Sequence, residues 1–129
     1  LFRLPGLRTA VINVDDAFGQ ELAAGMPATI RVIRTSSRIR ADLFAQDIVA
    51  DGHGLRFDLC AGEVRAHVET RLLGHFNVDN LLLVAGLLQA EGVAITDIAA
   101  LFARAEPVPG RMNRVDVRDG QALVVVDYA

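Results

Sequence analysis

The sequence predicts a mixed α/β fold: part of a mostly parallel sheet with flanking helices, plus a small antiparallel meander. Three observations support this fold class. The first third of the chain reads as a strand, a helix and a second strand. The middle third holds three strand-like segments separated only by short turn signals, and such short connections join antiparallel neighbours. The last third opens with two helical segments, which can cover a face of the sheet.

The first third predicts a strand over residues 9–14, because this run is short and almost wholly apolar. Asp15 and Asp16 come directly after it and can cap a helix over residues 17–24. The same two carboxylates could bind a metal ion, but capping is the favoured interpretation. A second strand is expected over residues 28–34, where the alternation of apolar and polar side chains is imperfect.

The middle third predicts strands over residues 41–50, 54–60 and 63–71, with glycine-containing turns between them. In the third segment apolar and polar residues alternate, which is typical of an antiparallel strand with one solvated face. His67 lies on the polar face and is expected to be solvated. We interpret the three strands as a small meander that stands beside the main sheet.

The last third predicts a helix over residues 79–91, which is apolar nearly all round and is therefore expected to be buried. Thr96 can cap a second helix, and Pro107 ends it. A hairpin is then expected, with one strand over residues 113–118 and another over residues 122–127.

The composition is that of a folded protein with neither a nucleic-acid-binding nor a membrane-binding character. Hydrophobic residues make up 52% of the 129 residues and charged residues 22%, and the net charge is only −3. No apolar run is long enough to suggest a membrane span. Cys60 is the only cysteine, so no internal disulfide can form and a reducing cytoplasm fits.

The basic residues are all arginines, thirteen in number. A P-loop places a lysine ammonium against the terminal phosphates of a nucleotide. This chain has no lysine and therefore contains no P-loop. If the protein handles ATP phosphates in that way, the residues that do so lie elsewhere in it.

Two asparagines, Asn77 and Asn80, lie three residues apart at the entry to the long apolar helix. One interpretation is that either residue caps this helix, as asparagine often does. The other is recognition of adenine, because an amide offers a donor and an acceptor together and can match the edge of the base. The two interpretations are compatible.

Two further polar residues stand at positions that could contact a nucleotide. Arg111 follows a Pro-Gly bend, where it could be a solvated surface residue or could bind phosphate or ribose through its planar guanidinium. Asp127 ends a valine-rich strand, where it could be a turn residue or could accept hydrogen bonds from ribose hydroxyls.

The order of the motifs is more informative than any one of them. The run Gly74 to Asn80 resembles the G-x-F-N-V-x-N motif of the Mur ligases, and Pro109 to Met112 resembles their P-G-R-M-E motif. The run Ile12 to Gly19 is similar to the family's I-N-x-D-D-x-x-G segment, and Val124 to Ala129 looks like the start of V-V-D-Y-A-H-T-P. The last motif together with F-N-V-x-N points within the family to the UDP-N-acetylmuramoyl-tripeptide synthetases.

The resemblance implies an internal fragment of an ADP-forming ligase of peptidoglycan synthesis. Residues 1–110 would be the C-terminal half of the central ATP-binding domain, and residues 111–129 the hinge and first strands of the C-terminal domain. Such enzymes join meso-diaminopimelate or lysine to UDP-N-acetylmuramoyl-L-alanyl-D-glutamate. They use ATP and Mg²⁺ and activate the substrate carboxylate as an acyl phosphate.

By the same resemblance, Asn77 and Asn80 would face adenine, Arg111 would contact ribose or phosphate, and Asp127 would hold the ribose. The family's P-loop and its carbamylated, magnesium-bridging lysine are absent, so no catalytic residue and no metal ligand is expected in this stretch. We therefore expect the chain alone to be inactive. The family's glutamate after P-G-R-M is replaced here by Asn113, so any role of that charge is in doubt.

Two other classes of protein remain as alternatives. One is a related ligase with the same ATPase core, such as a cyanophycin or folylpolyglutamate synthetase. The other is a non-catalytic module that binds only a nucleotide or a partner protein.

Overall fold

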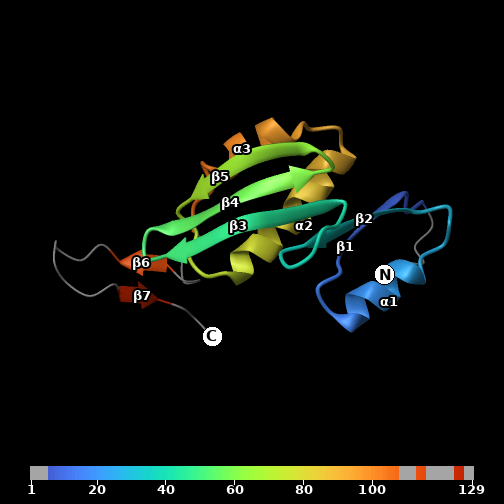
Figure 1. Cartoon of the computed structure of the whole chain (residues 1–129), viewed down its shortest axis with the longest axis horizontal. Helices are drawn as coiled ribbons and strands as arrows, with labels where there is room; N and C mark the ends of the chain where they lie inside the picture. The colour runs from blue at the N-terminus through green and yellow to red at the C-terminus, as the bar shows by residue number, and fades with distance from the viewer. Residues whose placement is uncertain (1–5, 108–112, 116–123, 127–129) are drawn as a thin grey trace.

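The computed structural model describes residues 6–107 in full and the backbone of residues 113–115 and 124–126. Its centre is a five-stranded sheet whose strands follow their sequence order from one edge to the other (Figure 1). The strands of this sheet are β1 (Thr9–Asn13), β2 (Arg31–Ser36), β3 (Leu43–Asp51), β4 (Gly54–Ala61) and β5 (Val64–Thr70).

The sheet is parallel at one end and antiparallel at the other, which confirms the predicted α/β class. β1 and β2 are parallel along the whole of β1. β2 and β3 are parallel through only two residue pairs, Thr35–Leu43 and Ser36–Phe44. β3, β4 and β5 pair antiparallel as the predicted meander.

The meander continues the main sheet, whereas the sequence predicted that it stands beside it. The reason lies in the turn after β2, where Ser36 Oγ accepts hydrogen bonds from Arg38 N at 3.0 Å and Ile39 N at 2.8 Å. This turn brings the chain back beside the end of β2, close enough for β3 to hydrogen-bond to it.

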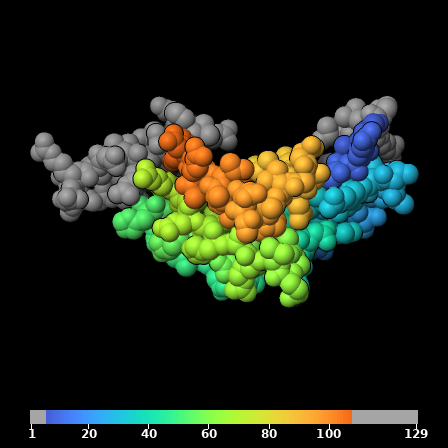
Figure 2. Space-filling view, turned by 90° about the horizontal axis from the view of Figure 1, so that it is seen from above, coloured from blue at the N-terminus to red at the C-terminus, as the bar shows by residue number. Residues whose placement is uncertain are grey.

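Helices cover both faces of the sheet. α1 (Ala17–Ala24) packs on one face, where Ala23 joins a small core with Ala10 and Ile12 of β1. α2 (Phe76–Ala90) and α3 (Ile95–Phe102) cover the other face and enclose the main core. Figure 2 views this layer from above, with α3 in orange next to the end of α2 and over the green strands of the meander.

The first third of the chain folds largely as predicted. β1 and α1 match the expected ranges, and Asp16 is the N-cap of α1, with its Oδ1 atom accepting from Gly19 N at 2.7 Å. β2 begins later than predicted because residues 28–30 form a turn closed by Ile30 N and Pro27 O, 2.9 Å apart. In β2 the buried apolar residue is Ile33, which faces α2.

α2 begins at Phe76, three residues before the predicted start. Gly74 has a φ of +87°, and a Cβ atom there would lie 2.5 Å from the ring of Phe76. Only glycine suits both the positive φ and the lack of space for a Cβ atom. Gly74 therefore lets the chain turn into the helix while the ring of Phe76 lies against the backbone of residue 74. His75 is the N-cap and makes no capping bond with its side chain, so the interpretation of Asn77 or Asn80 as the cap is wrong.

α2 is buried along one face only, although its sequence is apolar nearly all round. The buried face contacts β1, β2 and β3, and at Gly86 the helix backbone comes so close to β1 that an added Cβ atom would lie 2.4 Å from Val11 Cγ1. The opposite face leaves Val84 44% and Leu87 59% exposed. The expectation of a wholly buried helix is therefore wrong for this face.

The remaining elements agree in kind with the prediction. α3 is present, but its N-cap is Ala94 and no side chain caps it, so the predicted capping by Thr96 is wrong. The predicted hairpin is confirmed by the antiparallel pairing of β6 (Asn113–Val115) with β7 (Val124–Val126).

Candidate functional site

A pocket of about 240 Å³ lies at the beginning of α2. Leu72 and Leu73, just before the helix, form part of its wall together with the ring of Phe76. The side chains of the first helical turns and of the segment after α3 complete it, namely Asn77, Asn80, Glu106 and Pro107. The structure thus brings together in one pocket the two asparagines that the sequence singled out.

Hydrogen bonds fix how the two amides are presented. Asn77 Nδ2 donates to the carbonyl oxygen of Leu73 at 2.7 Å and so ties the helix to the segment before it. Asn77 Oδ1 in turn accepts from Asn80 Nδ2 at 3.2 Å. Within residues 6–107, Asn80 Oδ1 has no hydrogen-bond donor, and each amide keeps a second N–H. Asn80 is exposed, so it is the amide that is free to meet a ligand.

The pocket combines a flat apolar wall with an amide edge. Phe76 is a large hydrophobic residue that is nevertheless 51% exposed, and an exposed aromatic ring can stack on a planar ligand. An asparagine amide can form two hydrogen bonds to N6 and N7 of adenine. The arrangement therefore suits a purine base better than a phosphate, because the pocket is lined by no cationic side chain among the described residues and by one glutamate.

Arg111 and Asp127, the other predicted site residues, lie outside the described residues. Their roles stay predictions. Glu106 was missed because nothing near it in the sequence marks it. It reaches the pocket through the packing of α3 against α2, which only the tertiary structure shows.

A second polar cluster joins the carboxyl end of β1 to the turn after β2. The carboxylate of Asp15 accepts from Ser36 Oγ, from Ser37 N at 3.0 Å and from Ser37 Oγ at 3.2 Å. Burial raises the pKa of Asp15, but these hydrogen bonds and the charge of Arg38 outweigh it, so the pKa is lowered overall. The carboxylate is thus used to hold the two strand ends together.

The described residues include no group of three or more His, Cys, Asp or Glu side chains that could hold a metal ion. They do include two buried oxygen atoms without a hydrogen-bond partner, Thr35 Oγ1 at the end of β2 and Asp79 Oδ1 in the first turn of α2. None of the helices in this part of the chain is long and apolar enough to cross a membrane.

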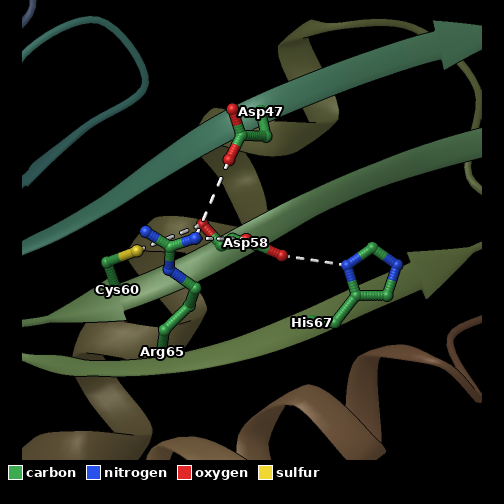
Figure 3. A network of polar contacts seen from close by, with 5 residues as sticks. All are labelled: Asp47, Asp58, Cys60, Arg65 and His67. Atoms are coloured by element: carbon green, nitrogen blue, oxygen red, sulfur yellow. Dashed lines mark hydrogen bonds and ion pairs between the residues drawn. The ribbon is translucent and has the colours of Figure 1, made fainter.

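The outer face of the meander carries a network of ion pairs (Figure 3). Asp58 on β4 accepts from Arg65 Nη1 at 3.2 Å and lies 2.9 Å from His67 Nδ1, while Arg65 also lies 4.0 Å from Asp47. The side chain of His67 is 62% exposed, as predicted. Cys60 beside them is buried, and its burial raises the pKa of the thiol, which disfavours the reactive thiolate. This face is a solvated sheet surface stabilised by cross-strand pairs.

Comparison with known proteins agrees with the motifs. Residues 1–88 match the Mur ligase middle domain. The chain is 49% identical over its whole length to the UDP-N-acetylmuramoyl-L-alanyl-D-glutamate–2,6-diaminopimelate ligase of Xanthomonas campestris. It spans 26% of that relative's length.

Solved structures show the same fold. A structure of a UDP-N-acetylmuramoyl-L-alanyl-D-glutamate–2,6-diaminopimelate ligase matches with a TM-score of 0.76 and 35% identity, over 99% of this chain and 27% of that one. The MurF ligase of Thermotoga maritima, solved in complex with ADP, matches with a TM-score of 0.63 and 22% identity, over 93% of this chain and 26% of that one. A match to the middle domain over more than half of the chain, together with these relatives, establishes that the chain belongs to the Mur ligase family.

Proposed function

We propose that this chain is the adenosine-binding part of an ADP-forming ligase that adds meso-diaminopimelate to UDP-N-acetylmuramoyl-L-alanyl-D-glutamate in peptidoglycan synthesis. The observation that carries the proposal is the 49% identity to a ligase of that name over the whole chain. It favours diaminopimelate over lysine as the added amino acid, and it favours this ligase over a cyanophycin or folylpolyglutamate synthetase.

The pocket at the beginning of α2 supports adenine as its ligand. Asn80 has a free acceptor and a free N–H, which match N6 and N7 of adenine. Asn77 holds Asn80 in place and ties the helix to Leu73. We therefore assign base recognition to Asn80 and the positioning of its amide mainly to Asn77.

The remaining assignments follow from the sequence motifs. Arg111 contacts ribose or phosphate, and Asp127 holds the ribose. We place the boundary between the central domain, residues 1–110, and the hinge with the first strands of the C-terminal domain, residues 111–129, just before Arg111. Nucleotide binding at this boundary can then be linked to closure of the two domains.

ATP supplies the phosphoryl group that activates the substrate carboxylate, and we expect Mg²⁺ to accompany it. The chain has no lysine, so a P-loop lysine that faces the terminal phosphates would belong to another part of the protein. The substrates of the whole enzyme are the UDP-linked dipeptide and the amino acid, and we place the reaction in the cytoplasm.

The test is steady-state kinetics of the complete enzyme with Asn80→Ala, Asn77→Ala and Arg111→Ala. Each variant should raise the apparent KM for ATP, and Asn80→Ala should do so about tenfold, since a good amide–adenine pair contributes roughly 1–3 kcal/mol. The KM for meso-diaminopimelate should change much less. Gln89→Ala, which removes an amide near the other end of α2, is the matched control and should change neither value. An effect on the amino acid without one on ATP would refute the assignment.

A further inference from the structure

Glu106 is the one ionisable side chain among the residues that line the pocket in the described part of the chain. It comes from the segment after α3, whereas both asparagines come from α2. It lies outside the sequence motifs that define the site.

The backbone that leads to Glu106 is held by hydrogen bonds as far as Ala105. The chain leaves α3 through a turn in which Arg104 N donates to Leu101 O at 3.1 Å and Ala105 N to Phe102 O at 3.0 Å. Phe102 is 4% exposed and anchors this turn in the main core. Pro107 follows directly, and a residue before proline is restricted to extended backbone. Glu106 thus follows a hydrogen-bonded turn and precedes a proline that limits its backbone conformations.

Asn80 and Glu106 both offer the pocket a hydrogen-bond acceptor. Asn80 Oδ1 is an acceptor, and a glutamate carboxylate only accepts. The purine bases differ at position 6, where adenine carries an amino group and guanine an oxygen. Two acceptors suit the amino group, which has two hydrogens to donate. They oppose the oxygen, which would be left unpaired next to a negative charge.

We propose that Glu106 is a specificity-determining residue, which accepts a hydrogen bond from the 6-amino group of adenine and thereby excludes bases with an oxygen at that position. This inference rests on the proposed binding of adenine by Asn80. It assigns the choice of the base to a side chain that the family's motifs do not include.

The experiment measures the binding of ATP, GTP and ITP to the complete protein by calorimetry. ITP has the oxygen at position 6 but lacks the 2-amino group of GTP, so it isolates position 6. In Glu106→Gln the carboxylate becomes an amide that can donate to the oxygen. The ratios of Kd for GTP to ATP and for ITP to ATP should both fall about tenfold, because a hydrogen bond to a charged group is lost and a neutral one to the oxygen is gained. Glu106→Ala should lower both ratios less, since it only removes the acceptor.

The matched control is Glu91→Gln, which makes the same change of charge at an exposed position at the other end of α2. It should leave both ratios unchanged. If Glu106→Gln also leaves both ratios of Kd unchanged, the inference is overturned. It is overturned as well if Glu106→Gln weakens the binding of GTP, because the carboxylate would then bind the N1 and N2 donors of guanine.

Asn80→Ala separates the two proposals. If it weakens ATP binding while Glu106→Gln leaves the ratios unchanged, only the role of Glu106 fails. If Asn80→Ala leaves ATP binding unchanged, the adenine pocket itself fails and the inference fails with it.

Discussion

The contact between Gly86 of α2 and Val11 of β1 allows a sharp test of how the helix packs on the sheet. A Cβ atom at position 86 would lie 2.4 Å from Val11 Cγ1 and 3.1 Å from Val11 Cγ2. Carbon atoms in good contact are about 3.5–4.0 Å apart, so Gly86→Ala forces a movement of roughly 1 Å. Valine is stiff at χ1 and cannot easily turn both methyl groups away.

Two opposing energies decide whether Gly86→Ala raises or lowers the free energy of unfolding. Alanine stabilises a helix interior by about 1 kcal/mol relative to glycine. Overpacking a well-packed contact costs roughly 1–3 kcal/mol. Because the overlap is larger than 1 Å and involves a stiff side chain, we expect the cost to win and Gly86→Ala to lower the free energy of unfolding by about 1 kcal/mol.

The effect of Gly86→Ala on the free energy of unfolding should change sign when Val11 is replaced by the smaller alanine. In a Val11→Ala background both Cγ atoms are gone, and the nearest remaining atom, Cβ, lies 3.3 Å away. Gly86→Ala should then raise the free energy of unfolding by up to about 1 kcal/mol through helix propensity alone. Urea titration of the four proteins, followed by far-ultraviolet circular dichroism, gives the coupling energy. A coupling below about 0.5 kcal/mol, the usual limit of additivity, would refute the close packing.

Three further predictions concern the other features of the fold. Asp15→Asn should lower the free energy of unfolding at neutral pH by about 1–3 kcal/mol, because Ser36 and Ser37 lose a charged acceptor. Since the folded-state pKa of Asp15 is lowered, its contribution is complete above the ordinary aspartate pKa and is lost as the pH falls through the folded-state value; urea titrations from about pH 7 to pH 3 should therefore show the two proteins converging, and a constant difference would contradict this. Gly74→Ala should lower the free energy of unfolding by about 1–2 kcal/mol through its positive φ and should also weaken ATP binding by displacing Phe76; unchanged ATP affinity, measured by calorimetry, would count against the pocket wall. Asp58→Ala should cost no more than about 1 kcal/mol, with a smaller effect in high salt, because its partners are exposed; a salt-independent loss in thermal melts would show that the network is more than a surface one.

Local signals in the sequence predicted most helices and strands. The features that were not predicted depend on contacts that form only in the folded structure. The capping of α1 by Asp16 was predictable because strand, acid and helix follow one another directly. The start of α2 was not, because it depends on the positive φ of Gly74 and on the ring of Phe76 lying against it. The merging of the meander with the main sheet depends on the turn at Ser36, whose hydroxyl contacts no simple pattern reveals.

The candidate site divides in the same way. Asn77 and Asn80 could be singled out because they belong to a run that resembles a family motif, and both line the pocket, while their role in adenine binding stays a prediction. Their different tasks, one tying the loop and the other facing outward, follow only from the bond to Leu73. Glu106 could not be predicted, because α3 must first pack beside α2 to bring it there.

The two-pair ladder between β2 and β3 has a mechanical consequence. Two residue pairs give little resistance to twisting, so hydrogen bonds alone would leave the parallel and antiparallel halves of the sheet free to splay apart. α2 contacts β1, β2 and β3, so it braces the junction between β2 and β3 from one face of the sheet. The first turns of α2 also line the pocket. A rotation of α2 about its axis would therefore change the pocket and, at the same time, the contacts of the helix with both halves of the sheet.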